Sequence, residues 1–217
     1  MQLTKFTHAC VRLHAGAGTL VIDPGTLSES KAALYGADAV LITHTHADHL
    51  DVATVLAAAQ TRPQLRVWGP ADAGESLSAL GDRFSVVVPG DHFSAAGMQV
   101  RAVGGQHAAI HSSVTVPPNV GYLIEEQLYH PGDSLVVPPV PVGTLLIPTS
   151  APWAKLSEML DFLIAVRAPR ALQIHDALWG PIGTAVTESH LSRVADDYGL
   201  RFEHLDSGDV RDISDLK

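Results

Sequence analysis

The sequence predicts an α/β protein that folds as a single domain over residues 1–217. Short apolar runs typical of strands alternate with segments of helical periodicity along most of the chain. Hydrophobic residues make up 46% of the chain and charged residues 17%, a balance that supplies a core and argues against disorder. We find no repeat, linker or low-complexity segment, and 217 residues is an ordinary length for one α/β sandwich.

The first expected elements are an antiparallel meander over 3–23, in which apolar alternation closes on a turn at Pro24 and Gly25. Residues 38–43 form a short apolar run typical of a strand that is covered on both faces. Asp51 is placed to cap an alanine-rich helix that extends to about Gln60.

Strand and helix signals continue to the end of the chain. Further strands are expected at 65–68, 84–88, 98–103, 120–125, 128–130, 145–147, 171–174 and 201–205, and further helices at 72–80, 154–166 and 187–198. The strands at 120–125 and 128–130 are separated by so few residues that we expect a hairpin.

Composition limits where the protein works and what it binds. The formal net charge is −9 with histidines neutral, and no basic run provides the clustered cations that nucleic-acid binding requires. No apolar segment approaches the roughly eighteen residues of a membrane span, and residues 1–10 lack a signal-peptide layout. Cys10, the only cysteine, cannot form an internal disulfide and is expected to be a small buried hydrophobe. We therefore expect a cytoplasmic protein that binds neither nucleic acid nor membrane, with its oligomeric state left open.

Histidines are concentrated directly after the expected strand at 38–43. The run His44-Thr45-His46-Ala47-Asp48-His49 places three imidazoles and one carboxylate within six residues. Side chains at i and i+2 can face one site, and a turn beyond them lets i+4 and i+5 reach the same space. A histidine-rich polar loop without function is the alternative, but surface loops rarely assemble oriented, deprotonated ligands by chance. The run therefore predicts a metal site that serves two ions.

This run resembles the His-x-His-x-Asp-His signature of the metallo-β-lactamase superfamily, and later motifs follow that family's order. Gly104-Gly105-Gln106-His107, Gly132-Asp133-Ser134 and Ile174-His175-Asp176 match its remaining ligand motifs. The resemblance implies an αββα four-layer sandwich of two mixed β-sheets with helices outside and two metals at one sheet edge. It also implies the ligands: His44, His46 and His107 for one metal, Asp48, His49 and His175 for the other, and Asp133 as the bridge.

The absence of insertions narrows the resemblance to a compact branch similar to ascorbate-6-phosphate lactonase. The segments around His8, Asn119 and Trp153 carry this similarity. His8 is expected either at the mouth of the pocket or in a structural role. His111 is an alternative to His107 as a ligand, or a substrate group, or a surface residue. Structural or solvated roles are expected for the remaining histidines, which are His14, His92, His130, His190 and His204.

The expected chemistry is hydrolysis of a small substrate. Two divalent ions roughly 3.5–4 Å apart hold a bridging hydroxide and polarise the bond it attacks, which suits an ester, lactone, amide or phosphodiester. Zinc is the default for this ligand set, and manganese or iron would also be accepted. Asp48 is the expected catalytic residue, because one of its carboxylate oxygens can orient the nucleophile. The expected substrate-binding residues, with core packing as the alternative for the tryptophans, are His8, His111, Asn119, Trp153 and Trp179; Tyr122 falls beside them.

Three other functions compete with this one. A phosphodiesterase or nuclease of the same fold is disfavoured by the net charge of −9. A di-iron redox protein is disfavoured by His46, where such relatives usually carry glutamate. A non-catalytic scaffold stabilised by metal is disfavoured because all seven expected ligands are present. Fold alone does not decide among them.

Overall fold

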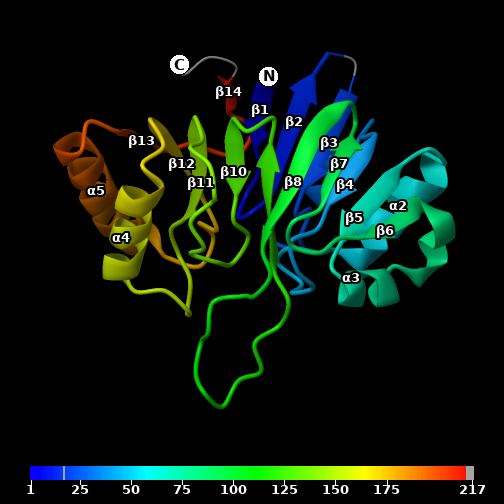
Figure 1. Cartoon of the computed structure of the whole chain (residues 1–217), viewed down its shortest axis with the longest axis horizontal. Coiled ribbons are helices and arrows are strands. Elements are labelled where there is room, and N and C mark those ends of the chain that lie inside the picture. Colours follow the sequence, from blue (N-terminus) through cyan, green and yellow to red (C-terminus); the bar gives the residue numbers. More distant parts are fainter. Residues whose placement is uncertain (17, 214–217) are drawn as a thin grey trace.

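The computed structural model describes residues 1–16 and 18–213, and within them two mixed β-sheets lie face to face with helices on the outside (Figure 1). The first sheet has the order β14-β1-β2-β3-β4-β5-β6, and the second has the order β13-β12-β11-β10-β9-β8-β7. The expected αββα sandwich is thereby confirmed.

The first sheet contains the opening meander. Its strands are β1 (Gln2–Lys5), β2 (Val11–Ala15), β3 (Gly18–Ile22), β4 (Ala39–Leu41), β5 (Arg66–Gly69), β6 (Phe84–Val86) and β14 (Val210–Asp212). Pairing is antiparallel from β14 to β3 and parallel from β3 to β6. Because β3 and β4 are parallel, the chain leaves both at the same edge, which carries Asp23 after one strand and the histidine run after the other.

The second sheet has the same mixed character. Its strands are β7 (His92–Ala95), β8 (Met98–Gly104), β9 (Val120–Ile124), β10 (Leu128–His130), β11 (Thr144–Pro148), β12 (Arg170–Ile174) and β13 (Arg201–Glu203). Pairing is antiparallel from β7 to β10 and parallel from β10 to β13. The expected hairpin is confirmed, since Leu128 pairs with Ile124.

Helices cover the outer faces of both sheets. The α-helices are α1 (Ser30–Ala33), α2 (Val52–Thr61), α3 (Ala71–Ser76), α4 (Leu156–Val166) and α5 (Pro181–Asp197). Asp51 caps α2 as expected, because its carboxylate accepts a hydrogen bond from the Thr54 backbone N–H at 3.0 Å. The helix expected at 72–80 was wrong in its second half: α3 ends at Ser76, and a 3₁₀ helix, Ser78–Arg83, follows with Gly81 at φ 54°.

Four differences from the expected elements concern short or polar segments. Helix α1 and the edge strands β7 and β14 were not expected, and α5 begins at Pro181 instead of Thr187. Pro181 occupies the first turn of α5, where its missing N–H costs nothing. Strand β14 pairs with β1, so the polar end of the chain adds an edge to the first sheet.

Three apolar clusters follow from this layering. The central one joins inward side chains of the two sheets, such as Leu13, Leu20, Tyr122 and Leu146. The other two lie between each sheet and its helices, and Cys10 is buried in one of them, as expected. Within residues 1–16 and 18–213, no helix is both long enough and apolar enough to cross a membrane.

Candidate metal centre

The histidine run is fixed at its root by Asp23. Its carboxylate accepts hydrogen bonds from the Thr43 backbone N–H at 2.8 Å and the Thr43 hydroxyl at 2.6 Å. The Val120 backbone N–H donates to the Thr43 carbonyl oxygen at 2.9 Å, which ties the run to β9 in the opposite sheet. The root of the loop is therefore tied to both sheets, at the edge that lies lowest in Figure 1.

The structure brings all seven expected ligands together at this edge. Their ligand atoms fall into two groups, each with mutual separations within 4.8 Å. The members are His44, His46, His107 and Asp133 in the first group, and His8, Asp48, His49 and His175 in the second. This grouping matches the division implied by the motif order, with His8 added.

The Asp133 carboxylate lies between the two groups. Its Oδ1 is 3.0 Å from Nε2 of His49, and its Oδ2 is 3.2 Å from Nε2 of His107 and 3.1 Å from Nε2 of His175. The side chain is only 3% exposed, so these imidazoles have little competition from water. Asp133 thus has the position that a carboxylate shared by two metals would need.

Each of four imidazoles uses its Nδ1 for a contact outside the cluster. Nδ1 of His49 lies 2.7 Å from Oδ2 of Asp23, and Nδ1 of His44 lies 3.0 Å from the Thr43 hydroxyl oxygen. Nδ1 of His107 and of His175 face the carbonyl oxygens of Ala108 and Ser150. In a neutral imidazole, donation by Nδ1–H leaves Nε2 unprotonated and aimed inward, which is the pattern of metal-ligating histidines.

Four buried atoms of the cluster have no hydrogen-bond partner among the described residues: Nε2 of His49, His107 and His175, and Oδ1 of Asp133. His49 Nε2 and Asp133 Oδ1 face each other without hydrogen-bond geometry. Burying such atoms without partners costs about 1–3 kcal/mol each. Divalent cations would satisfy all four, so the residues present fit a metal site.

Local electrostatics gives His44 and Asp133 the protonation states that metal ligands require, and leaves a proton on His49. Burial, together with neighbouring His49, lowers the pKa of His44 well below its ordinary value, so this imidazole is neutral. Burial would raise the pKa of Asp133, but His49, His107 and His175 outweigh it and hold the pKa well below its ordinary value. Burial opposes a proton on His49, yet Asp133 and Asp23 raise its pKa, and metal binding would release that proton.

His8 belongs to the second ligand group. It is completely buried beside Asp48, and its Nε2 is 3.0 Å from Asp48 Oδ2. The Ala177 backbone N–H donates to Nδ1 at 3.3 Å, which leaves the proton on Nε2 for donation to Asp48. His8 therefore supports the Asp48 carboxylate. Its burial lowers its pKa despite the hydrogen bond to Asp48.

The turn that carries His8 is held by an ion pair between the buried Lys5 and the partly buried Asp176. Lys5 Nζ is 3.0 Å from the His8 carbonyl oxygen and 2.9 Å from Asp176 Oδ2, while Asp176 Oδ1 accepts from the His8 backbone N–H at 2.8 Å. Asp176 follows His175 directly, so one segment positions both histidines. The sequence shows Lys5 three residues before His8 and Asp176 directly after His175, but it does not reveal that these two charged residues pair.

The other histidines lie outside both groups. Both ring nitrogens of His130 are engaged, Nε2 by the Ala9 carbonyl oxygen at 2.9 Å and Nδ1 by the Gly132 backbone N–H at 3.1 Å. His111 is exposed and hydrogen-bonds Ser113 in its own loop. Neither group contains the remaining histidines, which are His14, His92, His190 and His204.

The side chains expected to bind substrate have unequal access to a ligand. Asn119 is completely buried; its Oδ1 accepts from the Asp133 backbone N–H at 3.0 Å, and its Nδ2 donates to the Pro131 carbonyl oxygen at 2.9 Å. Its amide is therefore engaged in positioning Asp133. The Tyr122 hydroxyl donates to the Ile42 carbonyl oxygen inside the core.

The two tryptophans also differ in how accessible they are to a ligand. Trp153 is buried, and its Nε1 donates to Asp133 Oδ2 at 2.9 Å, so it is a support for the carboxylate between the two groups. This contact was not expected from the sequence. Trp179 is 45% exposed and donates from Nε1 to the Thr149 carbonyl oxygen at 3.0 Å, which leaves its ring open to solvent.

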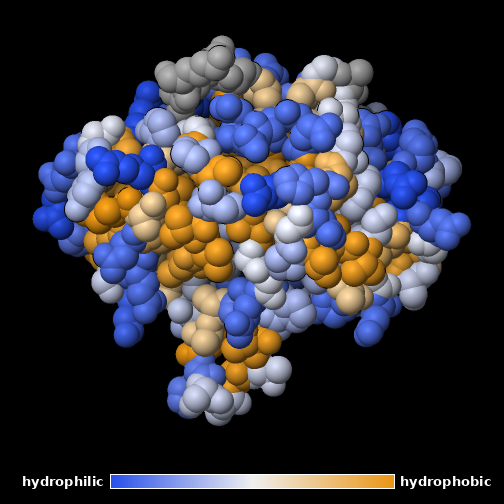
Figure 2. Space-filling model, in the orientation of Figure 1, coloured by the Kyte–Doolittle hydropathy of each residue, from blue (hydrophilic) through white to orange (hydrophobic). Residues whose placement is uncertain are grey.

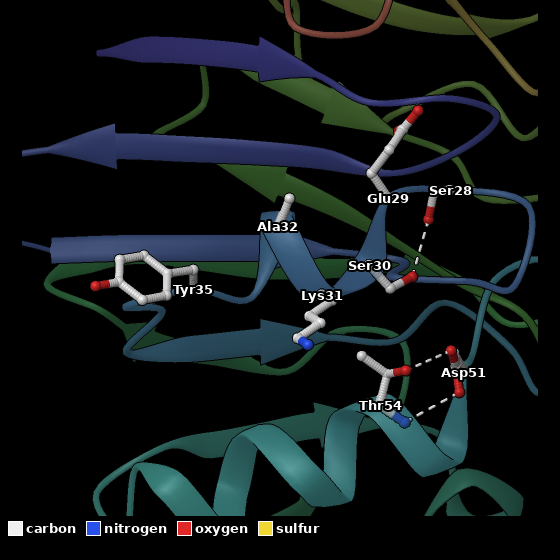
Figure 3. A pocket seen from close by; sticks show the side chains of 8 residues that line it. All are labelled: Ser28, Glu29, Ser30, Lys31, Ala32, Tyr35, Asp51 and Thr54. Atoms are coloured by element: carbon white, nitrogen blue, oxygen red, sulfur yellow. Dashed lines mark hydrogen bonds between the residues drawn. The ribbon is translucent and has the colours of Figure 1, made fainter.

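A separate surface hollow lies between α1 and the start of α2 (Figure 3). The residues that line it are Ser28, Glu29, Ser30, Lys31, Ala32, Tyr35, Asp51 and Thr54. Several of its polar groups already have partners: Ser28 bonds Ser30, and Asp51 bonds Thr54. None of its lining residues belongs to the two ligand groups. We therefore place the candidate centre at the sheet edge and not in this hollow.

Two mixed sheets that enclose a double histidine and aspartate cluster at one edge define a protein of the metallo-β-lactamase fold. The chain belongs to the beta-lactamase superfamily, because the family model of the beta-lactamase superfamily domain matches residues 2–175. The matched segment contains every residue of both ligand groups.

Sequence comparisons find similar proteins, and a structure comparison finds a protein of the same fold. The chain is 38% identical over 199 residues to Protein Rv0786c of Mycobacterium tuberculosis, which covers 89% of this chain and 92% of that protein. It is also 38% identical over 95 residues to a UPF0173 metal-dependent hydrolase of Methanoculleus marisnigri, covering 40% of this chain and 41% of that protein. Igni18, a metallo hydrolase of Ignicoccus hospitalis, shares the fold with a TM-score of 0.73 and 16% identity, and each chain is covered to 97%.

Proposed function

We propose that the chain is a hydrolase that depends on two divalent metal ions and cleaves an ester, lactone or similar bond of a small substrate. His44, His46 and His107 would hold one ion, Asp48, His49 and His175 the other, and Asp133 would bridge them. When bound, such ions supply a Lewis acid and an activated water molecule. Zinc is the metal we expect, and manganese or iron suits the same nitrogen and oxygen ligands.

The single observation that carries this proposal is the set of buried, inward-facing atoms without hydrogen-bond partners. Nε2 of His49, His107 and His175 and Oδ1 of Asp133 are buried around one point of the sheet edge. A scaffold without bound metal would leave this cost uncompensated. The names of the Methanoculleus and Ignicoccus proteins, both described as metal-dependent or metallo hydrolases, also support it.

Asp48 is the residue we propose to orient the attacking water. Its side chain is 25% exposed, whereas Asp133 is 3% exposed, so Asp48 is the carboxylate that water can reach. Its Oδ2 receives the hydrogen bond from His8 and lies 3.6 Å from His175 Nε2. Oδ1 is then the oxygen that can accept a hydrogen bond from the nucleophile.

Metal content tests the ligand assignment. Protein purified without chelator is expected to carry close to two ions per chain, and His107→Ala is expected to lower this number while His111→Ala is not. His107 is buried and faces Asp133, whereas His111 is exposed. Elemental analysis after gel filtration into metal-free buffer measures both. A single ion in metal-replete wild type removes the bridging role of Asp133, and the opposite ranking of the variants reassigns the third ligand.

Substrate preference tests the reaction class. We expect small esters and lactones to be hydrolysed with much higher kcat/KM than single-stranded RNA or bis-p-nitrophenyl phosphate. A net charge of −9 repels a polyanion, and the fourteen Lys and Arg residues are spread thinly along the chain. Rates are compared at low salt with the metals restored. Efficient RNA cleavage that falls steeply with added salt, without esterase or lactonase activity, would identify the nuclease alternative as correct.

A further inference from the structure

We infer that the substrate carries an uncharged, apolar group next to the bond that is cleaved, and that Ile110 and Val114 bind this group. The inference rests on the proposed hydrolase function, which it narrows to a class of substrate. Neither residue was singled out by the sequence, because both lie in a loop without helix or strand periodicity.

The first observation is a small recess of about 20 Å³ directly beside the candidate metal centre, which is room for the first carbon of a group and no more. Two of its walls are His46 and His107, both members of the first ligand group. The rest of its lining comes from the loop between β8 and β9, namely Ala108, Ile110, Val114, Thr115, Val116 and Pro117. A part of the substrate that extends from the metal centre on this side would contact mostly aliphatic carbon.

The position of this loop is fixed at its base. The His107 backbone N–H donates to the Pro117 carbonyl oxygen at 3.1 Å, and the Ala108 backbone N–H donates to the Asp133 carbonyl oxygen at 2.8 Å. The loop projects from the lower edge of the sheets in Figure 1. The recess is therefore held against the centre by the same residues that supply its ligands.

Exposed apolar side chains gather on the loops around this edge. Ile110 and Val114 are 44% and 46% exposed, although each lines the recess. Other large exposed hydrophobic residues on neighbouring site-edge loops are Val136, Val137, Leu178 and Trp179. Hydrophobic atoms are visible over the projecting loop in Figure 2. Such a concentration beside a candidate site is typical of a surface that binds an apolar ligand.

The same loops offer no charge to a ligand. Residues 102–124, 134–142 and 177–187 contain no Asp, Glu, Lys or Arg. The nearby cation Lys5 is 1% exposed and paired with Asp176, so it is not available to a substrate. A phosphate or carboxylate bound by these loops would lose hydration without gaining an ionic partner from them. The apolar group is therefore expected to be neutral.

A series of 4-nitrophenyl esters tests the apolar contact. From acetate through butyrate to hexanoate, kcat/KM of wild type is expected to rise by about twofold per added methylene, about half the value for full burial, because Ile110 and Val114 cover only one side of the chain. Ile110→Ser combined with Val114→Ser should reduce this rise to less than about 1.5-fold. Val210→Ser is the matched control, since Val210 is 49% exposed on β14 at the opposite end of the sheets. An equal rise in the double variant would overturn the assignment of these two residues.

A charged ester of equal length tests neutrality. The 4-nitrophenyl monoester of adipate differs from the hexanoate ester chiefly by a terminal carboxylate, and we expect at least a tenfold lower kcat/KM for it. Equal rates on the two esters would overturn the claim that the group is uncharged.

A binding measurement separates this inference from the proposed function. Ketones such as 2-butanone, 2-hexanone and 2-octanone are neutral and cannot be hydrolysed, and saturation-transfer NMR reports which of their protons contact the protein. Strong saturation of the terminal methyl of 2-hexanone in wild type, lost in the double variant, supports the inference even if no ester is cleaved. Equal saturation in both proteins refutes it, whatever the esterase activity.

Discussion

Replacement of Asp133 by asparagine is expected to lower kcat/KM on the best ester or lactone by at least about 1,000-fold, or about 4 kcal/mol. The second metal ion should also be lost under conditions in which wild type retains two. These effects are expected to be the largest of any single substitution at the centre, because Asp133 is the residue between the two ligand groups.

The geometry explains why a change of one atom has this effect. An asparagine would retain the Trp153 hydrogen bond by placing its carbonyl oxygen where Oδ2 now accepts from Nε1. Its amide nitrogen would then stand at the Oδ1 position, 3.0 Å from Nε2 of His49. An amide N–H is a donor and cannot ligate a cation, so one side of the bridge is lost together with the negative charge.

Metal content by elemental analysis and kcat/KM with metals restored measure this prediction. Asp91→Asn is the matched control, because the Asp91 carboxylate accepts from the Val88 backbone N–H in the turn before β7, away from both ligand groups. Circular dichroism of both variants checks that the fold is retained. An Asp133→Asn protein with two ions and more than a tenth of wild-type activity would rule out the bridging role.

The fold was largely predictable because its strongest signals are local. The apolar run before His44 forms β4, and the alternating residues before Asp23 form β2 and β3. Strands β7 and β14 were missed because they are short edge strands in which half or more of the side chains remain exposed or partly exposed. Their strand conformation depends on pairing with β8 and β1, which sequence periodicity does not reveal.

The candidate ligands were predictable for a similar reason, but the residues that hold these ligands in position were not. The run from His44 to His49 is contiguous, and each later motif follows directly after a strand. Trp153 and His8, in contrast, act on Asp133 and Asp48 through contacts between residues 20 and 40 positions apart. Such contacts follow from the packing of distant loops, so neither residue type nor spacing identifies them. Asp23 belongs with these supports, since its role depends on His49 lying across the parallel β3–β4 edge.

Gly25→Ala is expected to destabilise the fold and the metal centre together. A Cβ atom at residue 25 would lie 1.8 Å from the Asp48 carbonyl oxygen and 2.5 Å from the His49 backbone nitrogen. Both neighbours are backbone atoms of the ligand run, so no side-chain rotation can relieve the contact. The two segments are also joined by a hydrogen bond of 2.7 Å from the Thr26 N–H to the Ala47 carbonyl oxygen. Separating them would therefore move Asp48 and His49 and break this link.

Overpacking usually costs about 1–3 kcal/mol. We expect a cost of at least about 3 kcal/mol here, because the clash is with backbone atoms. For a chain of this size the cost lowers Tm by about 6–12 °C. Gly180→Ala is the matched control, because Gly180 has φ −71° and a Cβ there would meet nothing within 4 Å. It should cost no more than about 1 kcal/mol, since Gly180 is the N-cap of α5, where glycine is preferred to alanine. Thermal unfolding of both variants and of wild type, each with chelator and with added metal, measures the effect. If the Gly25→Ala protein has the same Tm as the Gly180→Ala protein and holds the same number of ions, the turn after β3 does not position the ligand run.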